Sequence, residues 1–115
     1  GKWTLKELLG HIIDTERIFA YRTLRFSRGD RTPLQGFDQD PYVENSRSNE
    51  RALTSLLDEF ETVRRANMFL LEELNENDLE RRGEASGAEV TVRALVYLLA
   101  GHAAHHLNIL RERYL

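Results

Sequence analysis

The sequence is defined first by what it lacks. It contains no cysteine, which excludes disulfide scaffolds, thiolate metal sites and cysteine nucleophiles. Only two prolines and seven glycines occur among 115 residues, which excludes a collagen-like or low-complexity chain. No apolar stretch approaches the ~20 residues that a membrane helix needs. The start of the chain shows no signal-peptide pattern, so we expect a cytoplasmic protein that does not associate with membranes.

An excess of basic residues is missing as well. Sixteen Lys and Arg stand against nineteen Asp and Glu, giving a formal net charge of -3. This balance argues against a nucleic-acid partner, because such proteins neutralise phosphates with clustered cations. The remaining composition, 41% hydrophobic and 30% charged, is that of a globular protein. At this length we expect one hydrophobic core and a single domain over residues 1–115.

Apolar residues recur at helical spacing along most of the chain. Thr4 and Glu7 form a capping-box pair that begins a helix, and Gly29 ends it, so we predict a helix over residues 4–28. The segment 29–47 holds both prolines and predicts a long connection.

A second helix is predicted to begin at Ser48 and to continue through an apolar stripe to Leu74. A polar segment follows, and Thr91 caps a last helix that runs to about Tyr114. The pattern contains no convincing strand and indicates an all-α fold. Three long helices leave an apolar face uncovered, so we expect cover from a helix upstream of Gly1 or from a second subunit.

Four histidines are the residues of chemical interest. On a helical wheel, His102 and His106 lie in the middle of the apolar stripe of the last helix, and His105 lies at its edge. Side chains four positions apart are neighbours on a helix, so two imidazoles could bind one metal ion. The alternative is a pair of neutral core histidines that donate and accept hydrogen bonds, and the pair alone leaves both interpretations open.

His11, near the start of the first helix, could complete a set of three ligands if the first and last helices are neighbours. Three nitrogen ligands plus water is the open arrangement of a catalytic metal site. The alternative for His11 is a histidine at the edge of the core. Asp14, three positions further, is either a partner of this site or a solvent-facing carboxylate.

Arg22 lies on the same side of the wheel as His11. One interpretation is a favourable interaction with the C-terminus of the first helix, and the other is a clamp for an anionic substrate. The sequence favours the first. His105, like Asp14 and Arg22, is kept as a residue that could contact the site or its substrate.

Two segments carry a family resemblance. The opening Trp3–Arg17 stretch (WTLKELLGHIIDTER) resembles the first metal-histidine helix of the DinB/YfiT-like superfamily, and the closing Gly101–Asn108 stretch (GHAAHHLN) resembles its His-x-x-x-His helix. The stretch Gly36–Asp40 is similar to a loop of one branch of that family. The resemblance implies a DinB-like four-helix bundle. The family's first helix precedes the tryptophan, so we expect that helix to be missing from these 115 residues.

The resemblance also implies one divalent metal ion per chain, held by His11, His102 and His106. Zn, Ni, Fe, Co and Mn are all compatible with such ligands. Family members include S-transferases and isomerases that use low-molecular-weight thiols, and proteins assigned as metal-dependent hydrolases, and many form dimers. We therefore expect a small-molecule substrate and a homodimer.

Two hypotheses for the function follow. The first is an enzyme in which the metal activates water or a low-molecular-weight thiol for hydrolysis or S-transfer. The second is a non-catalytic, dimeric helical-bundle protein with a binding or structural role. It is motivated by the uncovered face and by the lack of an obvious general base, since Ala103 stands where a zinc protease would carry glutamate.

Overall fold

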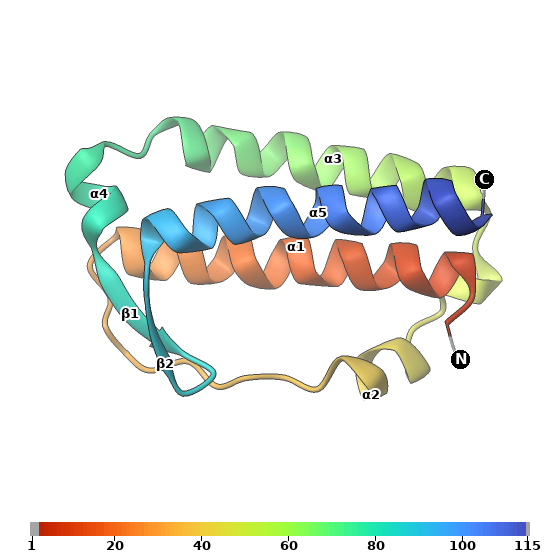
Figure 1. Ribbon diagram of the computed structural model, residues 1–115, viewed down its shortest axis with the longest axis horizontal. Coiled ribbons are helices and arrows are strands. Elements are labelled where there is room, and N and C mark those ends of the chain that lie inside the picture. The colour runs from red at the N-terminus through yellow and green to blue at the C-terminus, as the bar shows by residue number, and fades with distance from the viewer. Residues whose placement is uncertain (1–2, 115) are drawn as a thin grey trace.

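The computed structural model describes residues 3–114, except for the side chains of eight residues in the last helix. Those side chains are Ala103, His106, Leu107, Ile109, Leu110, Arg111, Arg113 and Tyr114. The elements in chain order are α1 (Leu5–Ser27), α2 (Gln39–Glu44), the 3-10 turn η1 (Ser48–Glu50), α3 (Leu53–Glu72), α4 (Glu76–Glu80), β1 (Arg82–Ala85), β2 (Ala88–Thr91) and α5 (Val92–Tyr114). The fold is mostly helical, as the sequence predicts (Figure 1).

Both ends of α1 are fixed by local hydrogen bonds, which confirms the predicted helix. The Thr4 hydroxyl accepts from the Glu7 backbone N–H at 3.1 Å, and the Glu7 carboxylate accepts from the Thr4 N–H at 2.8 Å. At the other end Gly29 has a φ of 85°, in the left-handed region that glycine adopts without strain. The Asp30 N–H then donates to the Arg25 carbonyl, which satisfies a carbonyl left open in the last turn.

The prediction that a long helix begins at Ser48 is wrong. Ser48 starts the short turn η1, and α3 begins at Leu53 after Arg51 has taken an extended conformation. The Ser48 side chain is instead buried against α1. A Cβ on Gly10 would lie 2.2 Å from the Ser48 hydroxyl oxygen, so glycine at position 10 allows this close approach.

The expectation that the chain has no strand is also wrong. β1 and β2 pair antiparallel, and their turn residues Ser86 and Gly87 have φ values of 54° and 79°. Two positive φ values in a two-residue turn are typical of a type I′ hairpin. Leu34 joins the hairpin through hydrogen bonds with Glu84 and Ser86, so the long connection is anchored to it.

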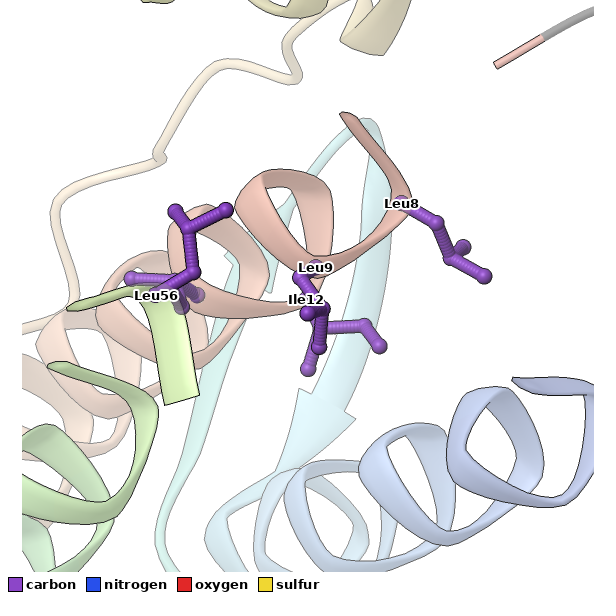
Figure 2. Packing of buried hydrophobic residues seen from close by; sticks show 5 residues of the cluster. Leu8, Leu9, Ile12 and Leu56 are labelled. Atoms are coloured by element: carbon purple, nitrogen blue, oxygen red, sulfur yellow. The ribbon is translucent and has the colours of Figure 1, made fainter. Parts of the chain in front are cut away.

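α1 is the central helix of the fold and packs against both α3 and α5. In Figure 1, α1 and α5 lie side by side and run in opposite directions. One cluster of buried residues joins α1 to α3, and Figure 2 shows its packing: Leu8, Leu9, Ile12, Ile13 and Leu56. A second cluster joins the end of α1 to the hairpin and to the start of α5: Phe26, Ala85, Val92 and Leu95.

The apolar stripe predicted for α3 is only partly buried. Leu56 is fully buried, whereas 42% of Leu57 is exposed. Phe69 on α3 and Tyr97 and Leu98 on α5 are also exposed. The described residues thus carry apolar side chains that they do not themselves cover. No helix in this part of the chain combines the length and the apolar character that crossing a membrane requires.

Candidate functional site

The structure brings His11 and His102 together from opposite parts of the sequence. Because α1 and α5 are antiparallel neighbours, a residue in the first half of α1 can face one near the middle of α5. The ring centroids of His11 and His102 are 5.2 Å apart, and the planes meet at 67°. His11 is 5% exposed and His102 is half-buried. His11 is therefore a buried residue and not a histidine at a solvent-exposed edge.

Two aromatic side chains flank this histidine pair. The Trp3 ring centroid lies 4.8 Å from that of His11, and the Phe19 ring centroid lies 6.1 Å from that of His102. Aromatic rings at these distances shield the imidazoles from bulk water on two sides. Low local polarity strengthens the interaction of an imidazole with any charged group that it holds.

The other two histidines have different places on α5. His106 follows His102 by four positions in the same helix, and its side chain lies outside the described residues. His105 is exposed. Among the side chains that the structure describes, no three His, Asp or Glu lie close enough together to hold a metal ion.

Asp14 lines a separate cavity of about 180 Å³ between α1, the 46–51 segment and α3. Arg51 and Glu59 are also in its wall. Burial raises the pKa of Asp14, Arg17 lowers it, and the negative charge of Glu59 raises it further. The hydrogen bond that Arg51 donates to Glu59 lowers the pKa of that carboxyl. The pKa values of the two carboxyls in this cavity are therefore shifted in opposite directions.

The favoured interpretation of Arg22 is a favourable interaction with the C-terminus of α1. Its hydrogen bonds go instead to the long connection and to the hairpin turn. Arg22 is 7% exposed, and its Nη2 donates to the Gln35 carbonyl at 3.2 Å and to the Ser86 hydroxyl at 3.3 Å. Its guanidinium lies 5.8 Å from the centroid of the Phe19 ring. Burial lowers the pKa of Arg22. The side chain thus lies beside the aromatic wall of the histidine pair.

Sequence reasoning missed a buried ionic cluster that joins the three long helices. The Glu16 carboxylate on α1 accepts two hydrogen bonds from Arg64, at 2.9 and 3.0 Å, and one from Asn67 at 3.0 Å. Arg64 also donates to the Leu99 carbonyl of α5 at 3.3 Å. By its spacing Arg64 belongs to the charged, solvent-facing side of α3, but the structure directs its guanidinium to Glu16. The signal in the sequence was Glu16 itself, a charged residue between the apolar positions Ile12 and Phe19.

Comparisons with known proteins give one family and one similar fold. A family model described as the DinB superfamily matches residues 1–110. The chain is similar in structure to YfiT from Bacillus subtilis, with a TM-score of 0.86, 19% identity and 97% of this chain covered. That protein is described as a probable metal-dependent hydrolase with an unusual four-helix bundle topology, and the chain spans 65% of its length. No curated protein matches in sequence.

Proposed function

The chain belongs to the DinB superfamily, and from this premise we propose that it binds a divalent metal ion through His11, His102 and His106. The observation that carries the proposal is the contact between His11 and His102. YfiT, the structural neighbour described as a probable metal-dependent hydrolase, supports the same chemistry.

The separation of the two imidazoles fits a shared ion. Imidazole nitrogens bind zinc at about 2.0–2.1 Å, so two imidazoles in a tetrahedral site have ring centroids about 5 Å apart. The centroids of His11 and His102 are 5.2 Å apart. His106, one helical turn beyond His102, is the third proposed ligand.

The proposed reaction is hydrolysis or S-transfer on a small molecule. A divalent cation held by three histidines supplies Lewis-acid chemistry, which makes water or a low-molecular-weight thiol nucleophilic near neutral pH. Trp3 and Phe19 exclude bulk water from the two imidazoles that they flank. His11 is fixed by its burial in the core, so its ring is held in place before any ligand arrives.

Metal content tests the ligand set directly. Protein purified without added metal and then titrated with Zn²⁺, Ni²⁺ or Mn²⁺ is expected to hold about one ion per chain. Alanine at His11, His102 or His106 should weaken that binding at least tenfold, whereas His105→Ala is the matched control because His105 is exposed. Circular dichroism checks that each variant is folded. Unchanged metal affinity in His102→Ala would contradict the proposal.

An activity assay separates the two reactions. In the first assay, metal-loaded protein is mixed with p-nitrophenyl acetate. In the second assay, it is mixed with 2-mercaptoethanol and 1-chloro-2,4-dinitrobenzene. A hydrolase accelerates the first reaction and a thiol transferase the second, in both cases only with His106 intact.

The second candidate is a non-catalytic dimer, which the exposed Phe69 and Tyr97 favour. A homodimer that covers these side chains would sediment as two chains at micromolar concentration and as one chain after Tyr97→Glu. Stoichiometric metal together with metal-dependent turnover would reject this candidate.

A further inference from the structure

A line of buried polar side chains extends along α1 from the histidine pair. His11, Thr15 and Arg22 are the three members of this polar line, and each is at most 7% exposed. At 100° per residue, the three positions fall within about 40° of one another on the helix. Ile18 shares this face, so three of its four positions from 11 to 22 are polar. Buried helix faces are normally apolar, and this polarity favours a polar ligand along the face.

Thr15 has an unused hydroxyl group. Its Oγ1 is buried and has no hydrogen-bond partner among the residues that the structure describes. Threonine in a helix commonly donates to the carbonyl four residues earlier, and Thr23 and Thr62 do so here at 2.8 and 2.7 Å. The Thr15 hydroxyl, one turn from His11, does not. A buried hydroxyl without a partner is rare and indicates an absent ligand or water.

Arg22 is buried, and within the described part of the chain no carboxylate pairs with its guanidinium. The guanidinium has five N–H donors, and its two hydrogen bonds both come from Nη2 and go to neutral acceptors. Arg64 shows the ordinary solution, because it pairs with Glu16 through two hydrogen bonds. A buried cation without a counter-ion is costly to keep, so its retention favours a role in binding an anion.

We propose that Thr15 and Arg22 bind a carboxylate of the substrate, while the rest of the substrate extends along the Phe19 ring toward the histidine pair. This inference rests on the proposed function for the reacting end of the substrate. It assigns the substrate class as a small organic acid.

The chemistry of the two side chains selects a carboxylate. A guanidinium matches a carboxylate with two parallel hydrogen bonds, and a hydroxyl can donate a further one. The described part of the polar line holds a single cation, which balances the one negative charge of a carboxylate. The present acceptors of Arg22 belong to Gln35 and Ser86, which are exposed residues that water can solvate when an anion displaces them.

Binding of simple carboxylates tests the proposal. The probes are acetate, butyrate and succinate, each with its uncharged amide, titrated by NMR into metal-stripped and into metal-loaded protein. We expect at least one of these carboxylates to bind and its amide not to bind. Arg22→Gln should weaken that binding at least tenfold, and Thr15→Val about threefold or more. Arg28→Gln, at an exposed arginine next to the end of α1, should leave it unchanged. Equal binding by wild type and Arg22→Gln, or by acid and amide, would overturn the proposal, as would no binding at all.

Two further readouts separate this inference from its alternatives. If Arg22 only fastens the hairpin to α1, Arg22→Met should lower Tm by several degrees, whereas a binding role predicts an unchanged or higher Tm. Arg22→Lys keeps the charge but loses the bidentate geometry. This variant should fold, and it should bind the carboxylate more weakly than wild type does.

Carboxylate binding by metal-stripped protein does not depend on the histidines. Failure of the metal titration therefore refutes the proposed function alone, and failure of the carboxylate titration refutes this inference alone.

Discussion

The buried carboxylate of Glu16 provides the sharpest prediction about stability. The side chain of Glu16 is 2% exposed and that of its partner Arg64 is 30% exposed. Glu16→Ala removes three hydrogen bonds and leaves a guanidinium facing an apolar interior. Breaking a buried pair by removing one partner costs about 3–5 kcal/mol. Because Arg64 can turn toward water, we expect the low end of this range, about 3 kcal/mol.

Chemical denaturation measures the free energy of unfolding that Glu16→Ala loses, and thermal melting gives a second measurement. For a domain of this size, a loss of about 3 kcal/mol corresponds to a fall in Tm of roughly 10 °C. The control is Glu61→Ala, which breaks the exposed pair between Glu61 and Arg65. That pair is a surface contact four positions apart on one helix, so its removal should cost less than about 0.5 kcal/mol.

A paired replacement tests the reasoning from the other direction. In Glu16→Leu/Arg64→Met both charges are gone and similar volumes remain, so stability should return to within about 1 kcal/mol of wild type. A loss below about 1 kcal/mol in Glu16→Ala would refute the argument, because it would mean that this pair is worth no more than a surface pair.

Two further predictions concern packing and pH. Gly83→Ala should destabilise the fold by about 1–3 kcal/mol in denaturant titrations, because its Cβ would meet the buried Phe26 ring at 2.4 Å. Gly101 lies in the interior of α5 with open space around it, so Gly101→Ala should instead stabilise the fold by about 0.5–1 kcal/mol. A change in unfolding free energy of the same sign in both variants would contradict this account of the packing. The hydrogen bond from Arg25 lowers the pKa of Asp30 from 3.8 to about 2, so this pair stabilises the fold above pH 4 and loses its contribution as the pH falls toward 2. Melting curves should therefore show Asp30→Asn less stable than wild type at pH 5, with most of the difference gone at pH 2. A constant difference would show that the pair does not titrate.

The sequence predicts the central helix well because the signals for α1 are local. The capping pair Thr4 and Glu7 and the stop at Gly29 act within a few residues of the helix ends, so they can be recognised without tertiary information. The histidines were also recognisable, since an imidazole on an apolar stripe needs hydrogen-bond partners wherever it is buried. Their convergence on one ion stays a prediction.

The features that sequence reasoning missed depend on contacts distant in the chain. Strands of four residues are too short to show alternation, and the Ser86–Gly87 turn was the available signal for the hairpin. Arg64 belongs by spacing to a polar helix face, and only the approach of Glu16 makes it a buried partner. The contacts of Arg22 with the long connection and the hairpin turn likewise follow from how those segments return to α1.

The central position of α1 has a consequence for folding during synthesis. The Leu56 cluster needs only α1 and α3, so it can form once residue 72 has left the ribosome. The Phe26 cluster and the contact between His11 and His102 both await α5. Until then His11 lacks its neighbour on α5, whereas Arg22 can already reach its acceptors on Gln35 and Ser86. The arginine end of the polar line can therefore assemble earlier in synthesis than the histidine pair, which forms last because His102 comes from α5.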